Sequence, residues 1–463
     1  MSSLAVSRKR RDVDMTEGNT LRHLINFAVP LLFGNLFQQL YNMVDTWVVG
    51  NYGQGEAFSA VGTVGPIINT LIGFFVGFSS GAGVVISQYY GARDEEKVSK
   101  AVHTSIIMTV ILGAFFTVIG IFMVPLMLDL MNTPETVKPQ ATQYLTVYFA
   151  GIVGLMIYNI GSGILRAVGD SRRPFYFLVV SAVINTVLDL VFVLYFGMDV
   201  FGVALATVIA QAVSAILVLI TLFRSKNCVK LSLKEMKLSL AMLGKIVKIG
   251  LPAALQMMIT SFSNVFVQSY INQFGEDFMS GWTAYSKIDQ LLLLPMQSIA
   301  LASTTFVVQN LGKDQVKIAR GGVRTAIVLS VAITLVLMVP VMIFSPYLVM
   351  FFNPKAAVIQ HGSMLLRLIS PFYVLCCINQ ILAGALRGSG NTRAPMIILL
   401  ASFVFFRQAY LFVVSRYISN TVTWIAMAYP AGWLVASATL FLYYYFCDFS
   451  SKVIIPKPKE ARE

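Results

Sequence analysis

The sequence predicts an all-α polytopic membrane protein with twelve transmembrane helices in two six-helix bundles. Hydrophobic residues make up 57% of the 463 residues and charged residues only 12%, about half the charged share of a soluble domain. Polar clusters divide the chain into twelve apolar stretches, each long enough to cross a bilayer. A pattern that follows the fourth stretch recurs 221 residues later, which indicates two related halves.

The twelve stretches divide evenly between the halves. In the first half, spans are expected near residues 24–50, 57–90, 98–128, 139–166, 174–196 and 201–223. In the second half, they are expected near residues 245–272, 278–311, 317–352, 357–387, 394–416 and 422–447. The predicted division is therefore an N-terminal tail, an N-lobe, a linker, a C-lobe and a C-terminal tail, at residues 1–23, 24–223, 224–244, 245–447 and 448–463.

The linker at residues 224–244 is polar and rich in lysine. Apolar residues alternate along it, and we interpret this pattern as a short amphipathic helix on the membrane surface.

Basic residues predict the orientation. If the N-terminus is cytoplasmic, inner segments and helix ends hold 28 of the 34 basic residues. Three lie in predicted outer loops, Lys138, Lys355 and Arg416, and the remaining three lie inside predicted spans. The positive-inside rule then places both termini in the cytoplasm, and we expect the chain in the bacterial cytoplasmic (inner) membrane. The net charge of +13 is spread over separate short segments, so we expect no nucleic-acid partner.

The internal repeat is the most specific signal. The turn after the fourth span contains Gly163, Arg166, Gly169, Asp170 and Arg172. The turn after the tenth span contains Gly384, Arg387, Gly390, Asn391 and Arg393. Glycine with Asp or Asn favours a tight turn between antiparallel helices, and the prolines that follow are suited to the start of the next helix. We interpret these turns as structural, with their arginines as anchors at the cytoplasmic surface.

Other positions match at the same offset of 221. Gln88 and Gly91 align with Gln309 and Gly312. Because each half has an even number of spans, both halves enter and leave on one side of the membrane. A pseudo-twofold axis along the membrane normal must therefore relate them, as in parallel-repeat transporters that bind substrate between their halves.

The paired turns, the twelve spans and the 6+6 repeat resemble the multidrug and toxic compound extrusion (MATE) family, from about Leu21 to Cys447. The resemblance implies a secondary active antiporter that exports organic cations or amphipathic drugs in exchange for H⁺ or Na⁺. Its two bundles would rock to give alternating access. The superfamily also contains lipid-linked oligosaccharide flippases, so a flippase for a lipid-linked anionic sugar, or a carrier of another anion, is the alternative. We expect a monomer.

Two acidic residues fall inside predicted spans of the N-lobe. Asp45 lies about 8 Å and Asp189 about 10 Å from the outer end of its helix, so the two carboxylates share a level. Asn185 precedes Asp189 by one helical turn on the same face, and Thr207 and Tyr144 reach a similar depth. Oxygen ligands at one level predict a site for Na⁺ or for a shared proton.

The same positions resemble the cation site of those bacterial family members that carry it in the N-terminal lobe. The resemblance adds Asn159 to the set. By depth Asn159 fits less well, because it follows Tyr144 by fifteen residues and should lie about 22 Å further in. We expect no cofactor besides the coupling ion and no other metal site.

Charged residues in the predicted spans of the C-lobe form a different set, namely Lys287, Asp289, Arg367 and Arg407. They could form a structural charge network, or the three bases could recognise an anionic substrate group. Charges in the hydrocarbon region are costly and are candidates for function.

The first helix contains Pro30 and Gly34, which we expect to make it bendable. Ion binding at Asp45 and Asp189 would then change how this helix packs and so expel the substrate. The sequence has no H-E-x-x-H helix, nucleophile elbow or P-loop. We therefore expect neither an enzyme nor an ATP-driven pump.

Overall fold

The computed structural model describes residues 14–52, 57–131, 133–447 and 449. Throughout these residues the regular secondary structure is helical. Most of the predicted tails, residues 1–13 and 450–463, lie outside the described part of the chain.

The first half contains α1 (Thr20–Tyr52), α2 (Ala57–Gly91), α3 (Glu95–Leu130), α4 (Lys138–Ala150), α5 (Ile152–Ala167), α6 (Arg172–Leu190), η1 (Val191–Tyr195) and α7 (Asp199–Phe223). After η2 (Leu233–Glu235), the second half contains α8 (Leu240–Asn272), α9 (Glu276–Gly312), α10 (Val316–Ile343), α11 (Ser345–Phe352), α12 (Ala356–Ile369), η3 (Ser370–Phe372), α13 (Tyr373–Gly388), α14 (Arg393–Leu400), η4 (Ala401–Phe406), α15 (Arg407–Val413), η5 (Val414–Ile418), α16 (Val422–Ala426) and α17 (Ala428–Phe446).

These helices confirm the predicted twelve-span fold, if segments that continue one another count as one span. Ten helices in the described residues are long and apolar enough to cross a membrane, and α4 and α5 together make an eleventh span with a 48° bend. The remaining span is α1, which is 33 residues long. It is less apolar because amides such as Asn35, Gln38 and Gln39 lie in its middle.

The prediction of a single ninth span over residues 317–352 was wrong, because two separate helices cover this stretch. The structure ends α10 at Ile343 and begins the separate α11 at Ser345, with a proline in its first turn. Pro346 has no amide hydrogen, and its ring clashes with the carbonyl four residues earlier, so the helix stops before it.

The amphipathic helix predicted for the linker was also wrong. Only a single 3-10 turn, η2, forms between α7 and α8. Val229 and Leu231 are buried against the N-lobe, and the Ser232 amide donates to His103 Nε2 at 3.0 Å. The alternating apolar residues have the period of an extended strap rather than that of a helix.

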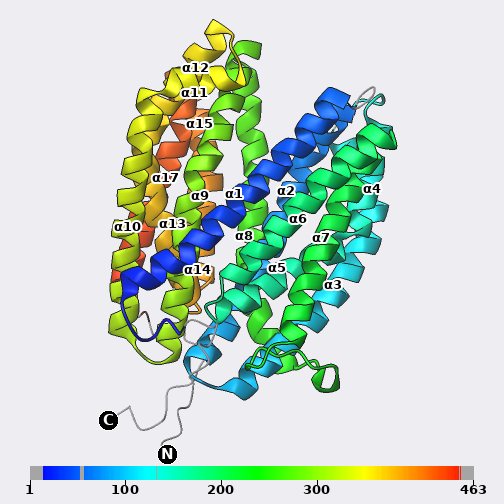
Figure 1. Ribbon diagram of the computed structural model, residues 1–463. Helices are drawn as coiled ribbons and strands as arrows, with labels where there is room; N and C mark the ends of the chain where they lie inside the picture. The colour runs from blue at the N-terminus through cyan, green and yellow to red at the C-terminus, as the bar shows by residue number, and fades with distance from the viewer. Residues whose placement is uncertain (1–13, 53–56, 132, 448, 450–463) are drawn as a thin grey trace, which may run out of the picture.

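Two bundles diverge from the end of the molecule where α1 begins and α17 ends, here called the terminal end (Figure 1). The helices α1 and α8 cross between them. At its start α1 packs in the C-lobe core, where Leu24 and Phe27 join Phe306. Near its other end Val48 belongs to the N-lobe core. The sequence boundary at residue 24 is therefore not the spatial boundary between the lobes.

The repeat mate α8 makes the opposite crossing. Ile246 and Ile249 pack in the N-lobe core, whereas Val267 and Ile271 pack in the C-lobe core. Midway along this crossing α8 lies directly against α2. A Cβ at Gly81 would lie 2.3 Å from the Gly250 backbone, so only glycine permits this approach.

A pair of symmetric contacts, here called the latch, joins the lobes at the terminal end. Gln88 Nε2 donates to the Gly388 carbonyl at 2.9 Å, and Gln309 Nε2 donates to the Ala167 carbonyl at 3.0 Å. Both glutamines are fully buried. Since 88 and 309, like 167 and 388, differ by the repeat offset of 221, the pseudo-twofold axis runs through the latch.

Glycines allow the latch to close. A Cβ at Gly91 would lie 2.1 Å from the Gln309 carbonyl oxygen, and a Cβ at Gly312 would lie 2.2 Å from the Gln88 carbonyl oxygen. The two chains therefore touch backbone to backbone where the repeats meet.

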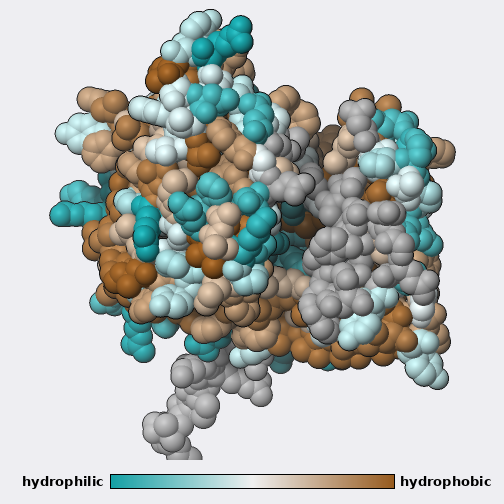
Figure 2. All heavy atoms as spheres, turned by 90° about the horizontal axis from the view of Figure 1, so that it is seen from above, coloured by the Kyte–Doolittle hydropathy of each residue, from teal (hydrophilic) through white to brown (hydrophobic). Residues whose placement is uncertain are grey.

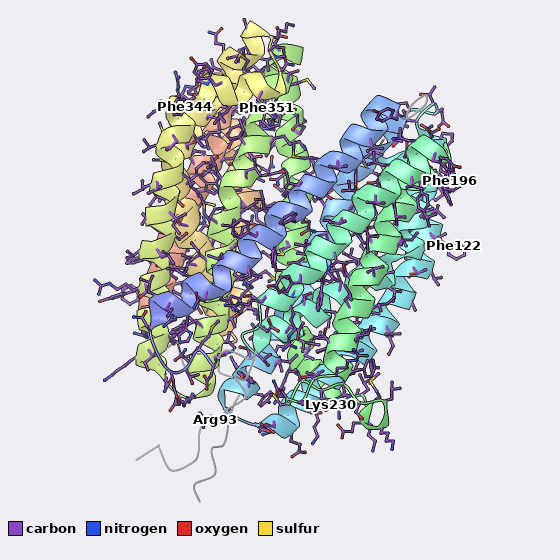
Figure 3. The ribbon with its side chains drawn as sticks, in the orientation of Figure 1. Arg93, Phe122, Phe196, Lys230, Phe344 and Phe351 are labelled. Atoms are coloured by element: carbon purple, nitrogen blue, oxygen red, sulfur yellow. The ribbon has the colours of Figure 1, made fainter. Side chains whose placement is uncertain are left out.

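The outer surface suits a lipid environment. Large apolar side chains point away from both bundles, among them Phe122, Phe196, Phe344 and Phe351, with 79%, 60%, 54% and 81% of their surface exposed (Figure 3). Arg93 and Lys230 lie at the terminal end. This distribution agrees with a protein that spans a bilayer.

The latch predicts the effect of a single methyl group. Gly91→Ala or Gly312→Ala overpacks the contact by about 1–3 kcal/mol, which shifts a two-state equilibrium about 5–150-fold toward separation at the terminal end. Spin labels at Lys230→Cys and Lys317→Cys, in a background without the native cysteines, will report a longer distance population. Gly321→Ala is the control, because a Cβ there meets no atom within 4 Å. Unchanged distances in folded Gly91→Ala protein would show that the latch does not set this equilibrium.

Candidate functional site

A cavity of about 470 Å³ lies between the two lobes. Seen from the end opposite the terminal end, the molecule is hollowed between its lobes (Figure 2). Side-chain amides are prominent in the cavity wall, from Asn35, Gln38, Gln39, Asn159, Gln211, Gln297 and Gln380. Apolar side chains such as Leu155 and Met257 complete the wall. Its volume falls within the range of small-molecule sites.

The charged residues in the described cavity wall are two arginines, Arg166 and Arg387. We predicted them to be anchors at the cytoplasmic surface, whereas they lie in the cavity wall. They precede their turns and belong to the last turns of α5 and α13. Both arginines are therefore helical residues rather than members of the turn.

The repeated turns themselves have one geometry. Gly169 and Gly390 adopt φ of 86° and 89°, a conformation that glycine tolerates best. Asp170 Oδ1 accepts from the amides of Arg172 and Arg173 at 3.1 Å, and Asn391 Oδ1 accepts from the Ala394 amide at 3.5 Å.

Other members of the turn motif lie in the helices beside it. Arg172 and Arg393 begin α6 and α14. Gly163 packs on Ser79 of α2, and Gly384 packs on Thr304 of α9. These glycines therefore let the helix before each turn approach its neighbour closely.

A second polar site lies inside the N-lobe, away from the lining of the cavity. Asp45 of α1 and Asp189 of α6 are buried, with 8% and 0% of their surface exposed. Their carboxylates are close enough to share a hydrogen bond, and Asp45 is also close enough to bond the Asn185 amide. We call this pair and its neighbours the carboxylate cluster.

Two hydroxyl groups complete the carboxylate cluster. Asn185 Nδ2 lies 3.5 Å from Thr207 Oγ1. The buried Tyr144 hydroxyl lies beside Thr207 and within electrostatic range of both carboxylates. Asn159 is elsewhere: it lines the central cavity and donates to the Leu155 carbonyl at 2.9 Å. The structure thus brings together five of the six residues considered for a cation site.

Several oxygens of the carboxylate cluster are buried without a hydrogen-bond partner. They are Asp45 Oδ1, Asn185 Oδ1 and both carboxylate oxygens of Asp189. Two facing carboxylates have no donor to offer one another, and buried unsatisfied charges are costly. A proton or a small cation with oxygen ligands would satisfy them. The residues present therefore fit either coupling ion.

The C-lobe charges do not form the predicted network. Asp289 accepts hydrogen bonds from the hydroxyls of Tyr285 and Tyr373. Arg407 instead donates to Ser263 at 3.1 Å and to Asn264 at 2.8 Å.

The other two C-lobe charges are exposed. Arg367 bonds Ser345 at 3.0 Å, while Lys287 projects from α9. Among the described residues no ion pair links these four side chains. Asp289 instead bonds hydroxyls of its own helix and of α13, and Arg407 bonds a hydroxyl and an amide of α8. None of the four lines the cavity.

Pro30 and Gly34 lie inside α1, which continues unbroken through both. A Cβ at Gly34 would lie 3.2 Å from Leu178 of α6. The glycine thus allows α1 to approach the helix that contributes Asp189.

Comparison with known proteins decides the family. The sequence model of the MatE family matches residues 30–191 and 252–410, one stretch in each half. The chain belongs to the MatE family. It is therefore a multi-pass membrane transporter of the multidrug efflux type, and the paired matches agree with the internal repeat.

Related proteins cover nearly the whole chain. A probable multidrug resistance protein, YpnP of Bacillus subtilis, is 29% identical over 94% of this chain and 96% of its own length. A FAD transporter of Shewanella oneidensis is 22% identical over 83% of this chain and 85% of its own length. A transporter of the MOP superfamily from Pyrococcus furiosus has the same fold, with a TM-score of 0.89, 24% identity and coverage of 95% and 98%.

Sequence reasoning missed the cavity lining of this MatE protein. Gln38, Gln211, Gln297 and Gln380 come from four different helices, and isolated amides in a span are most often helix–helix contacts. The repeat of Arg166 at Arg387 was a partial signal, because the pseudo-twofold axis places repeat mates at one depth and at equal distances from the axis.

The carboxylate cluster predicts ion-dependent stability. Na⁺ or protons that bind the folded protein stabilise it by about 2.7 kcal/mol at 100 times the dissociation constant. Asp45→Asn should lose this gain and, without ion, unfold no earlier than wild type, because the repulsion between carboxylates is gone. Thermal unfolding followed by tryptophan fluorescence, across Na⁺ and pH titrations, measures both effects. Asp129→Asn, which changes an exposed carboxylate, is the control. Equal ion-dependent stabilisation of Asp45→Asn and wild type would contradict an ion at this cluster.

Proposed function

We propose that the protein is an ion-coupled antiporter that exports amphipathic small molecules by alternating access. The observation that carries the proposal is the carboxylate cluster: Asp45 and Asp189 face one another in the N-lobe with oxygens that lack partners. A site of this kind exchanges H⁺ or Na⁺, and the separate central cavity has room for a small molecule. Two sites in one rocking structure are what exchange of ion for substrate requires.

The helix α1 connects the two processes. It starts in the C-lobe core at Leu24, lines the cavity at Asn35 and Gln38, and reaches the carboxylate cluster at Asp45. A change in ion occupancy at Asp45 alters the packing of α1 against α6, and the continuous helix carries that change to the interface between the lobes. Pro30 lies between the two ends and lowers the resistance of the helix to bending.

The orientation follows from charge. Arg93 and Lys230, which belong to two of the basic inner segments predicted from the sequence, lie at the terminal end. We place this end, with both termini, in the cytoplasm. The cavity then faces outward, and the latch closes the cytoplasmic side. Since one chain supplies both sites, the working unit is a monomer.

The cargo has two candidate classes. Relatives named as multidrug resistance proteins support amphipathic drugs, including organic cations. A relative named as a FAD transporter supports an amphipathic anion. The cavity wall favours the second class, because its described charges are Arg166 and Arg387 and a cation would find no carboxylate there.

Transport by purified protein in proteoliposomes tests the proposal. Na⁺ and pH gradients are imposed separately, and the movement of ethidium and of flavin mononucleotide is followed by fluorescence. Wild type should move at least one dye in response to one gradient. Asp45→Asn should move it at least tenfold more slowly, because a lost coupling interaction of about 1.4 kcal/mol already corresponds to a factor of ten.

Asp129→Asn, with its exposed carboxylate, should behave as wild type. Absence of gradient-driven movement for both dyes, or full movement by Asp45→Asn, would refute ion-coupled antiport through this cluster.

A further inference from the structure

We infer that the floor of the central cavity binds an anionic group, a phosphate or a carboxylate, carried by an amphipathic substrate, and that Arg166 and Arg387 hold it. This inference names a cargo class for the proposed transport function and rests on that function. The repeated turn motif alone gave Arg166 and Arg387 no role in substrate binding.

Arg166 and Arg387 occupy equivalent positions of the two halves and line one cavity. Arg166 and Arg387 are repeat mates, both partly buried and both in the wall of the same cavity. The residues that follow them, Ala167 and Gly388, provide the carbonyls of the latch. The two guanidinium groups therefore lie at the closed end of the cavity, one from each lobe.

The two arginines bring positive charge to the cavity. Neither guanidinium belongs to an ion pair in the described part of the chain, and the described cavity lining contains no carboxylate. Arg387 Nη1 donates to Gln256 Oε1 at 3.3 Å, and Tyr158 lies within electrostatic range of Arg166. Two positive charges without an acidic partner in one confined cavity attract an anion.

The two arginines are not needed to cap the C-terminal ends of their helices, a common role of basic residues at such positions. The backbone of the turn already performs that task. The Asp170 amide donates to the Leu165 carbonyl at 3.0 Å, and the Asn391 amide donates to the Leu386 carbonyl at 3.0 Å. The side chains of Arg166 and Arg387 are thus free of a capping role.

The hydrogen-bond donors of the two arginines suit an acidic group. A guanidinium presents a planar set of donors that matches the oxygens of phosphate and carboxylate, often in pairs. Hydroxyls of Ser80 and Ser87 and the amides of Gln297 and Gln380 line the same space. Leu155 and Met257 offer an apolar surface for the body of the substrate. The wall as a whole suits a molecule with one acidic and one apolar part.

Binding of matched flavins tests this site without any gradient. Flavin mononucleotide and riboflavin share one body and differ by a phosphate, and both are fluorescent. The purified full chain should bind the phosphate-bearing flavin at least tenfold more tightly. Arg166→Gln and Arg387→Gln should each reduce that preference at least tenfold, and Arg166→Lys should restore part of it because the charge returns without the paired donors. Arg367→Gln, an exposed arginine outside the cavity lining, should keep the wild-type preference.

Competition distinguishes the sources of the phosphate. Displacement of bound flavin mononucleotide by oleoyl lysophosphatidate, but not by monooleoylglycerol, would extend the site to lipid-borne phosphates. Failure of both lipids to displace it would restrict the site to soluble ones.

Equal binding of both flavins without displacement by lysophosphatidate, or an unchanged preference in Arg166→Gln, would overturn the inference. Gradient-driven ethidium transport with no phosphate preference would leave the proposed antiport intact and remove this site. Phosphate-dependent binding without gradient-driven transport would do the reverse.

Discussion

The close contact between the lobes at the terminal end is the constraint on which the rest of the structure depends. Gly91 and Gly312 let the backbones touch, and the buried amides of Gln88 and Gln309 exchange hydrogen bonds with the opposite lobe. Buried amides must find partners, so opening this end leaves four polar groups to be rehydrated. The cavity exists because the lobes meet at one end and diverge at the other.

The two lobes share their helix arrangement but differ in their buried acidic residues. The crossing of α1 into the C-lobe is matched by the crossing of α8 into the N-lobe. The buried acids are not matched: Asp289 receives two tyrosine hydroxyls, whereas Asp189 has no donor for either oxygen. A satisfied carboxylate stabilises one protonation state, and an unsatisfied pair responds to ions. The proposed ion coupling therefore rests on the N-lobe.

At the closed end of the cavity, each arginine of the cavity wall is adjacent in sequence to a residue of the latch. Arg166 precedes the latch carbonyl of Ala167, and Arg387 precedes that of Gly388. An anion held by both arginines would bridge the two lobes directly above the latch. A ligand shifts a conformational equilibrium only by its differential affinity for the two states, so an anion that bound both arginines only when the lobes are closed would favour closure.

The sequence by itself determined the number of spans, all but one of their ends to within a few residues, the repeat and the acids of the N-lobe, because hydropathy and a constant repeat offset can be read directly from the chain. It even placed Asp45 and Asp189 at one level, since helix rise converts residue number to depth. However, the depth of a residue along its helix does not tell in which direction around the helix its side chain points. Only the tertiary structure decided that Asn159 faces the cavity, that Arg166 does so as well, and that Asp289 pairs with tyrosines rather than with Arg407. Those outcomes depend on the rotation and crossing of packed helices, which no single helix encodes.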